Sequence, residues 1–433
     1  MHDRRAFLGM TGAVALAGAG EASAQGIALE PGFDRAMGDF ASAQATFGRL
    51  YDIDRTIANF DAAYYGAMTR PVQAIYAEKV GWVNRVNALY LRSAVPGHPR
   101  DAELDRSRAE VAGLLGCKTQ EIALSTGGTE ALYALITNYR LLKAGDAVLL
   151  ADVDYDEMQY AMEYLKESRG AEVVRFDLPE PMTRANILSA YDRILRDTPR
   201  AKLLLLTHLS NRNGLVPPVR EIVAMAKARG VDVILDSAQT VGHLDFTVAD
   251  TGADFIGFSL HKWLAAPLGN GGIYIREGRL GDIAPYLGNR IHDESDIRAR
   301  VPTGTADIAA RLTIPAAVAM HRAIGPKRKL AHLRALRDHW IAGVREVKGL
   351  QLMLPDEPDN HGSVSAFRLP GQRDWAQAQA VQKLFLDKYR LLVVAKRGLA
   401  SGPVLRVTPA LFNTTAELDR LIAAIQAERG LFA

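Results

Sequence analysis

Short apolar runs and longer amphipathic stretches alternate along the chain between residues 121 and 276. The apolar runs are rich in Val, Leu and Ile, which favours buried strands, and the stretches between them have helical periodicity. The pattern predicts strands at 121–125, 147–151, 172–176, 202–208, 231–236, 254–259 and 272–276, with helices at 131–142, from 156 to about 168, at 183–196 and at 219–229. Alternating βα units of this kind predict an α/β fold in which helices flank a mostly parallel sheet.

The flanking regions predict a second, smaller domain. An amphipathic helix is expected at 102–115, and residues 59–66 are interpreted as a loop near a functional site. A long helical stretch at about 315–348 is a natural connector. Beyond it the pattern predicts an α+β domain with strands at 351–354, 363–368, 391–395 and 404–408 and helices at 374–388 and 415–428. We therefore expect a large domain within 25–320 and a small C-terminal domain at 321–433.

Composition and charge exclude several classes of function. The 433 residues are 48% hydrophobic and 23% charged, which is ordinary for a globular chain of two domains. The formal charge of +3 is spread without a basic block, so neither nucleic acid nor an anionic membrane surface is an expected partner. A single cysteine excludes an internal disulfide, and no ligand cluster predicts a metal site.

The first 24 residues have the pattern of an export signal. Arg4 and Arg5 precede a short apolar run, and Ala22-Ser23-Ala24 forms an A-x-A cleavage site. Twin arginines in this setting are typical of a bacterial Tat signal. The run is too short to be a good transmembrane helix, so we expect no stable membrane association. The Tat export machinery is an expected partner, and the mature protein is expected in the periplasm.

Two consecutive strand ends deliver an acid and a lysine to one edge of the sheet. The strand 231–236 ends at Asp236, and Lys262 closely follows the strand 254–259. Ligands of parallel α/β proteins bind at this edge. A lysine that can form a Schiff base, with an acid for a pyridinium nitrogen, is the pair that a pyridoxal phosphate (PLP) site needs.

A candidate phosphate site lies upstream of this pair. Gly127, Gly128 and Thr129 run directly into a predicted helix. Free backbone N–H groups at a helix start, together with the helix dipole, favour a bound phosphate. A simple turn with an N-cap is an equally good interpretation of these residues alone.

The motifs together resemble a known family. Asp236-Ser237-Ala238-Gln239 and Ser259-Leu260-His261-Lys262-Trp263 resemble the class V aminotransferase-like PLP enzymes of fold type I, with the closest likeness to the isopenicillin N epimerase-like branch. The resemblance extends over about 59–412.

The resemblance implies roles around the cofactor ring. Lys262 would hold PLP as a Schiff base and move the α-proton. Asp236 would face the pyridine nitrogen and keep it protonated. Gln239 would donate to the ring O3′, Tyr155 would stack on the ring, and Asn211 would lie near O3′ and the substrate.

It also implies how phosphate and substrate are bound. Gly128 and Thr129 would bind the phosphate with help from Ser259 and His261. Thr305 would reach the phosphate of a neighbouring subunit, which implies a homodimer. Arg406 would clamp the substrate α-carboxylate through a bidentate pair.

Plainer interpretations stay open for single residues. Asp236 can be a helix N-cap, Lys262 a solvated lysine and His261 a packed core residue. Arg406 can be part of a structural salt bridge. The combination of these residues in one βα chain favours the PLP site.

The chemistry expected at this site is not cysteine desulfuration. That reaction needs a thiol on a loop of the small domain, and the corresponding loop, 396–402, has no cysteine. Cys117 precedes the strand 121–125, where a small packed residue is expected. Epimerisation, transamination or a more specialised oxidation or decarboxylation at an amino-bearing carbon remains. The substrate would be an amino acid or a peptide-like molecule.

Two alternatives follow from the export signal. One is a periplasmic PLP enzyme that tailors a siderophore side chain of the pyoverdine type. The other is a non-catalytic exported binding protein that keeps the fold. The presence of Asp236, Gln239, Lys262 and Arg406 together argues against the second.

Overall fold

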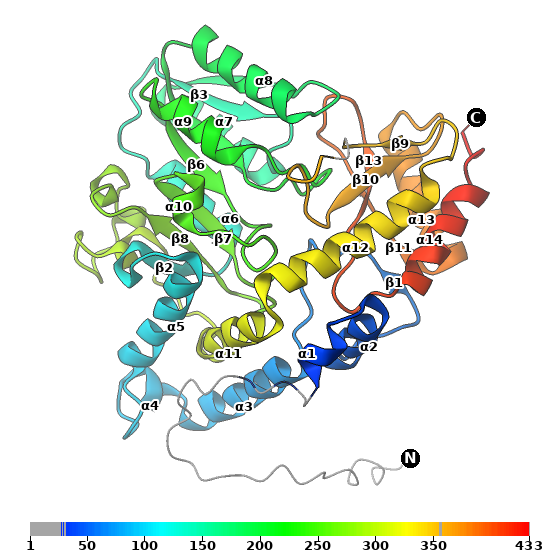
Figure 1. Cartoon of the computed structure of the whole chain (residues 1–433). Helices are drawn as coiled ribbons and strands as arrows, with labels where there is room; N and C mark the ends of the chain where they lie inside the picture. The colour runs from blue at the N-terminus through cyan, green and yellow to red at the C-terminus, as the bar shows by residue number, and fades with distance from the viewer. Residues whose placement is uncertain (1–26, 28, 30–31, 355–356, 433) are drawn as a thin grey trace, which may run out of the picture.

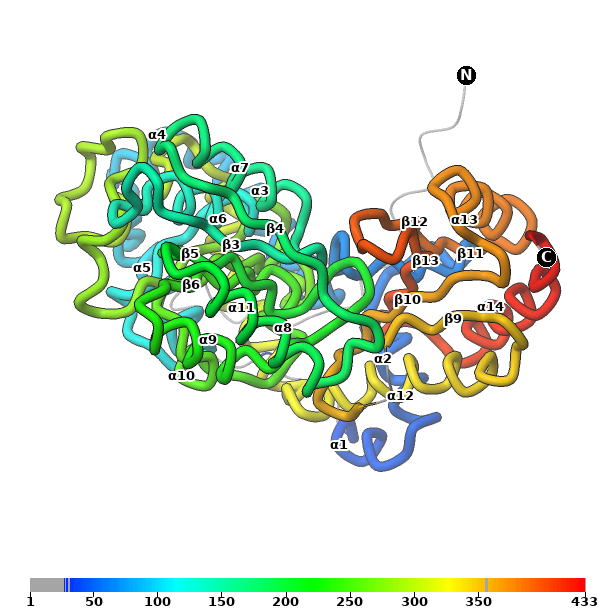
Figure 2. The backbone as a smooth tube through the Cα atoms, turned by 90° about the horizontal axis from the view of Figure 1, so that it is seen from above, coloured from blue at the N-terminus to red at the C-terminus, as the bar shows by residue number. Residues whose placement is uncertain are grey.

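The computed structural model describes residues 27, 29, 32–354 and 357–432. Figure 2 shows a larger and a smaller lobe side by side, with α12 (Pro326–Val344) running along the smaller one. The predicted signal at 1–24 lies outside the described residues. Within the part of the chain that is described, no helix is both long and apolar enough to cross a membrane.

A seven-stranded sheet forms the centre of the larger lobe (Figure 1). Its strands lie in the order β2-β8-β7-β6-β5-β3-β4, and β8 runs antiparallel to both of its neighbours while the other neighbouring pairs are parallel. The predicted mostly parallel sheet is therefore confirmed. The bounds are β2 Ile122–Ser125, β3 Ala147–Ala151, β4 Glu172–Phe176, β5 Ala201–Thr207, β6 Asp232–Asp236, β7 Phe255–Ser259 and β8 Gly271–Ile275.

Helices cover both faces of this sheet because its central strands are apolar on both sides. Alternate residues enter different cores: Leu150 and Leu205 pack in one cluster, and Leu149 and Leu204 in the other. The first cluster includes residues of α6 (Gly128–Thr137) and α7 (Asp156–Arg169). The second includes residues of α5 (Arg100–Leu115), α8 (Arg184–Asp197) and α9 (Val219–Lys227), and α10 (Val248–Thr251) lies beside α9.

Helix α6 begins and ends earlier than the predicted range 131–142. It starts at Gly128, after Gly127 in an extended conformation, and ends at Thr137. The glycines therefore form the start of the helix itself rather than a turn in front of it. This places the first helical turn directly beside the end of β7.

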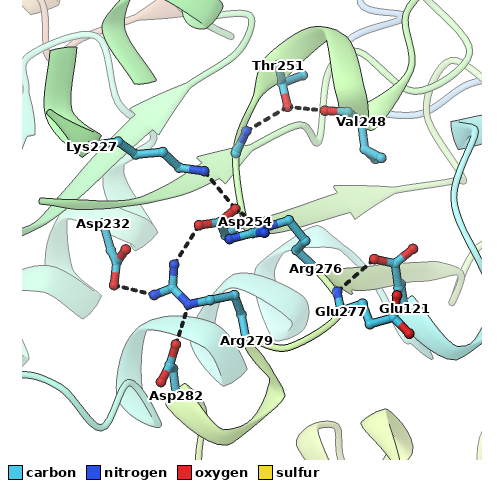
Figure 3. Close-up of polar contacts among 11 residues, drawn as sticks. Glu121, Lys227, Asp232, Val248, Thr251, Asp254, Arg276, Glu277, Arg279 and Asp282 are labelled. Carbon is cyan, nitrogen blue, oxygen red and sulfur yellow. Dashed lines mark hydrogen bonds and ion pairs between the residues drawn. The ribbon is translucent and has the colours of Figure 1, made fainter. Parts of the chain in front are cut away.

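A network of ion pairs lies at the amino ends of β6 and β7 (Figure 3). Asp254, just before β7, accepts from Lys227 at 2.7 Å and from Arg279 at 2.6 Å, and it also pairs with Arg276. Arg279 in turn pairs with Asp232 at the start of β6, at 2.7 Å. The amino ends of β6 and β7 are thus fixed by ion pairs, and their carboxyl ends carry the candidate site.

The predicted helix 315–348 is two helices. Helix α11 (Ile308–Ile324) ends at Gly325, which has φ 90°, and Pro326 starts α12. A positive φ and a proline at the first helical position both favour a break at this point. Helix α11 packs against α3 (Arg70–Val86) and α5, whereas α12 packs against α14 (Thr415–Ala427).

The smaller lobe contains a four-stranded sheet in the order β12-β13-β10-β9. Its strands are β9 Gln351–Leu352, β10 Ser365–Arg368, β12 Val394–Lys396 and β13 Val404–Val407, and α13 (Trp375–Tyr389) and α14 complete its core. The predicted strand 391–395 is divided between β11 (Leu391–Leu392) and β12.

Part of the N-terminal segment joins the smaller lobe. Strand β1 (Ala58–Asn59) pairs in parallel with β11. Among the described residues, the remaining α-helices are α1 Phe33–Ala36, α2 Phe40–Leu50 and α4 Ala88–Leu91. The division of the chain at 320 stays a prediction.

Candidate functional site

The carboxyl ends of β6 and β7 carry the predicted acid and lysine. Asp236 is the last residue of β6, is 5% exposed, and accepts a hydrogen bond from the Ala238 N–H at 2.9 Å. Burial raises the pKa of Asp236, and the Ala238 N–H and the charge of Lys262 act against this rise. Burial lowers the pKa of Lys262 to about 8, and Asp236 opposes that shift. The two groups therefore interact within one desolvated site.

Gly66 holds the backbone of the lysine. Its N–H donates to the His261 carbonyl at 3.1 Å, and a Cβ at position 66 would lie 1.7 Å from the Lys262 carbonyl oxygen. Only glycine fits at this distance. The segment 59–66, interpreted as a loop near the site, thus lies against the lysine, and Gly66 is a residue whose role the sequence did not reveal.

Gln239 is held in place from two sides. Its Nε2 donates to the Ala63 carbonyl at 2.8 Å, and its Oε1 accepts from Trp263 Nε1 at 2.9 Å. The ring of His243 stacks on Trp263 at 3.8 Å between centroids. One N–H of the Gln239 amide remains for the ring oxygen that the resemblance assigns to it.

The start of α6 brings three predicted phosphate residues together. The Gly128 N–H donates to Ser259 Oγ at 3.1 Å, and a Cβ at Gly128 would lie 2.6 Å from the same oxygen. A Cβ at Gly127 would lie 3.6 Å from Cε1 of His261. Thr129 is exposed in the first turn of the helix. Ser259 and His261 therefore lie beside the N-terminus of α6, which is favourable for an anion.

His261 is half-buried and hydrogen-bonded through its ring. Burial lowers its pKa, and its Nδ1–H donates to the Asn270 carbonyl at 3.2 Å. The ring is therefore held by the residue that directly precedes β8.

Arg406 is buried in an ion pair. The residue lies in β13 and is 2% exposed, its Nη1 donates to the Asn211 carbonyl at 2.8 Å, and its Nη2 pairs with the Asp61 carboxylate. Its Nε is buried without a hydrogen-bond partner. The structural salt bridge that the sequence offered as an alternative role for Arg406 is thus present. The role of Arg406 as a clamp for the substrate carboxylate stays a prediction. The sequence did not identify Asp61 as a partner of Arg406, because no local pattern connects Asp61 with β13.

The remaining predicted residues lie in different settings. Tyr155 immediately precedes α7 and is half-buried. Burial raises its pKa, and the negative charge of Asp236 contributes to the same rise. The backbone carbonyl of Asn211 contacts Arg406. Thr305 is exposed ahead of α11, and its contact with a neighbouring subunit stays a prediction.

The residues of the site fit PLP. It combines the half-buried, desolvated amine of Lys262, the buried acid Asp236 at the neighbouring strand end and a helix start whose glycine leaves no room for a side chain. Among the described residues no group of three or more His, Cys, Asp or Glu side chains can hold a metal.

Comparisons with known proteins agree with this geometry. The sequence profile of the family described as aminotransferase class-V matches residues 76–421. The chain is 29% identical to isopenicillin N epimerase of Streptomyces clavuligerus over 416 residues, which cover 91% of this chain and 100% of the relative. It is 26% identical to probable cysteine desulfurase 2 of Mycobacterium leprae over 379 residues, which cover 82% and 88%.

A solved structure confirms the fold. A cysteine desulfurase from Escherichia coli superimposes with a TM-score of 0.75 at 21% identity, covering 90% of this chain and 99% of that one. The predicted fold type I architecture of PLP enzymes is confirmed. With the profile spanning most of its length and the lysine, acid and helix start in place, the chain belongs to the class V aminotransferase family of PLP-dependent enzymes.

Proposed function

We propose that this enzyme acts at the amino-bearing carbon of an amino acid or a peptide-like molecule, by epimerisation or transamination. The observation that carries the proposal is the buried Asp236 at the end of β6 together with the half-buried, desolvated amine of Lys262 just after β7. The likeness to isopenicillin N epimerase supports the same class of reaction.

Each residue of the site has a physical task in this proposal. Bound PLP supplies an electron sink for negative charge at the carbon next to the substrate amine. Lys262 holds the cofactor and, once released, accepts or returns the proton at that carbon. Its pKa of about 8 suits this task better than the ordinary 10.5, because about a tenth of the amine is then neutral at pH 7. Asp236 favours a protonated pyridine nitrogen, and the α6 N-terminus with Ser259 binds the phosphate.

The loop 396–402 argues against desulfuration. In place of a thiol it offers backbone groups that are tied to the larger lobe: the Arg397 carbonyl accepts from Arg212 at 2.6 Å, and the Ala400 N–H donates to Asp152 at 2.9 Å. A Cβ at Gly398 would overlap the Arg212 guanidinium.

Cys117, the single cysteine of the chain, is a poor nucleophile. Burial raises the pKa of its thiol to about 12, so almost none is thiolate at neutral pH. This supports a reaction other than desulfuration, although the family also contains cysteine desulfurases that resemble the chain.

The visible spectrum of the purified protein tests the cofactor assignment. The protein is expected to show the absorption band of a lysine Schiff base, and Lys262→Ala is expected to remove it. The exposed Lys166 provides a matched control, and Lys166→Ala should keep the band. A protein that stays colourless with added PLP would refute the enzyme and support the non-catalytic alternative.

Incubation in D₂O separates the reactions. Deuterium at the α-carbon without a keto product indicates epimerisation, whereas a keto acid and the pyridoxamine form of the cofactor indicate transamination. Amino acids and peptide siderophore precursors are the compounds to test. Turnover of the precursors alone would favour the siderophore alternative, and release of sulfide from cysteine would overturn the proposal.

We also propose export through the Tat system, on the strength of Arg4, Arg5 and the A-x-A site. Replacing both arginines by lysine should shift the protein from the periplasmic to the cytoplasmic fraction. An unchanged distribution between the fractions would refute this part of the proposal.

A further inference from the structure

Trp263 connects the two strand ends that carry the candidate site. It directly follows Lys262, and its side chain is buried. The indole Nε1 donates to Oε1 of Gln239 at 2.9 Å, and Gln239 lies three residues after Asp236. The residue next to the predicted Schiff-base lysine is therefore hydrogen-bonded to the side chain that the resemblance assigns to the ring O3′.

The two hydrogen bonds of the Gln239 amide agree on one orientation. An indole N–H can only donate and a backbone carbonyl can only accept. The amide atom that faces Trp263 is therefore the oxygen, and the atom 2.8 Å from the Ala63 carbonyl is the nitrogen. A flipped amide would place two donors together at Trp263 and two acceptors together at Ala63. Nε2 keeps one further N–H, so in this orientation Gln239 can donate to an oxygen of the cofactor.

The indole of Trp263 is itself held on several sides. The ring of His243 stacks on it, with 3.8 Å between the ring centres and 23° between the planes. The Ser363 N–H donates to Nε2 of His243 at 3.0 Å, so the ring hydrogen lies on Nδ1, which is 3.2 Å from the Gln239 carbonyl oxygen. The Trp263 carbonyl accepts from the buried amine of Lys329. The indole cannot turn away from Gln239 without breaking these contacts.

Two glycines allow this close packing. Gly242 has φ 79°, and a Cβ at this position would lie 2.5 Å from the backbone nitrogen of Leu264. A Cβ at Gly362 would lie 2.7 Å from Nε2 of His243. The turn that follows Gln239 can therefore lie against the chain at Trp263 only where side chains are absent.

The polarity of the Gln239 amide affects one proton of the cofactor. In a Schiff base between PLP and a lysine, this proton lies either on the imine nitrogen or on O3′. A donor at O3′ stabilises the negative charge of that oxygen and so favours the proton on nitrogen, whereas an acceptor favours the proton on oxygen. The form with the proton on nitrogen absorbs visible light, and the other form absorbs mainly in the near ultraviolet.

We propose that Trp263 is a positioning residue that makes Gln239 a donor to O3′ and thereby keeps the proton on the nitrogen joined to Lys262. This inference rests on the proposed function, because it concerns the cofactor of the same site. Trp263 acts through Gln239, so its replacement should have no further effect once the amide is absent.

Trp263→Phe tests the inference, because it keeps an aromatic ring beside His243 and removes only the N–H donor together with part of the ring. The protein is loaded with PLP, freed of excess cofactor and measured near pH 7. The ratio of the visible to the near-ultraviolet band is expected to fall about fivefold, the factor that corresponds to one ordinary hydrogen bond. Gln239→Ala should lower the ratio at least as much.

The double variant separates positioning from a general effect on the fold. In the Gln239→Ala background, Trp263→Phe should change the ratio less than twofold, because both substitutions break the same interaction. Trp340→Phe is the matched control. Trp340 in α12 is fully buried, and its Nε1 has no hydrogen-bond partner among the described residues, so the same loss of volume should leave the ratio unchanged.

The outcomes distinguish the inference from the proposed function. A ratio in Trp263→Phe within twofold of the wild type would overturn the inference, and so would a full additional fall in the double variant. A wild-type protein without a visible band would instead refute the proposed function. Thermal unfolding verifies that each variant is folded, and Trp263→Met, which also lacks the N–H, replaces Trp263→Phe if that variant is unfolded.

Discussion

Gly66 lies so close to Lys262 that a methyl group at position 66 would overlap the lysine carbonyl oxygen. The N–H of the same glycine donates to the carbonyl of His261, so the chain before the lysine is fixed by an early segment. The backbone that carries the Lys262 side chain is therefore restricted in position by Gly66.

Gly66→Ala should weaken or abolish cofactor binding and destabilise the fold by about 1–3 kcal/mol, the usual cost of overpacking. Because the obstacle is backbone, it cannot move aside as a flexible side chain would. Urea unfolding and the visible band measure the two effects. The control is Gly81→Ala in the interior of α3, where the added methyl group meets nothing within 4 Å and should be neutral or stabilising.

The pKa of Lys262 sets the pH dependence of cofactor capture. The neutral amine is the form that attacks an aldehyde, and its folded pKa is about 8 against an ordinary value of 10.5. The rate at which the PLP-free protein forms the visible band should therefore rise with pH around a midpoint near 8. Asp236→Asn should move the midpoint lower, since Asp236 favours the charged lysine. A midpoint above 10 would contradict the burial of the amine.

Lys329 should make the protein more stable in mild alkali. Its amine donates to the Trp263 carbonyl, and burial lowers its pKa to about 7 from 10.5. Below pH 7 both folded and unfolded states carry the charge, and the folded state bears the full cost of burying it. From pH 7 towards 10.5 the folded state binds fewer protons, so the free energy of unfolding rises with pH.

Lys329→Met should remove part of that rise. Urea unfolding at pH 6.5 and pH 9 measures it, and Lys166→Met on the exposed face of α7 is the control. An equal rise in Lys329→Met and the wild type would show that the amine is not desolvated.

Asp254 should be the most sensitive residue of the network in Figure 3. Its side chain is 3% exposed and pairs with Lys227, Arg276 and Arg279. Although burial acts to raise its pKa, hydrogen bonds from Arg276 and Lys227 hold it below 3.8. The stabilisation is therefore present at neutral pH and is lost as the pH falls through this lowered pKa.

Asp254→Asn leaves three cations without their shared partner and should cost about 2–4 kcal/mol. Asp197→Asn on the exposed end of α8 should change the free energy of unfolding by less than about 0.5 kcal/mol. Chemical denaturation at neutral pH compares the two, and equal midpoints would show that the network does not stabilise the fold.

The sequence predicted the central sheet well because its strands are short apolar runs bounded by polar residues. All seven were expected within a few residues of their observed bounds, and the ends of β6 and β7 were enough to find Asp236 and Lys262. Local chemistry also identified the glycines at the start of α6. These features depend on neighbours in sequence, which a periodicity argument can detect.

Contacts between distant segments were beyond such an argument. Asp61 and Arg406 are 345 positions apart, and the residues around each of them give no indication of the pairing. The helical stretch 315–348 was predicted as one connector because its apolar periodicity continues across Gly325, where the structure turns. Tertiary packing decides the first case, whereas the second is decided by a local signal, Gly325 followed by Pro326, that the continuing periodicity concealed.

The segment from Asp61 to Gly66 gives the order in which the site can be completed. It contacts Arg406 in β13, Gln239 through Ala63, and the backbone of the lysine itself. Because β13 lies near the end of the chain, these contacts cannot all form until synthesis is nearly finished. Tight binding of the cofactor would then indicate that the segment 61–66 has docked against β13.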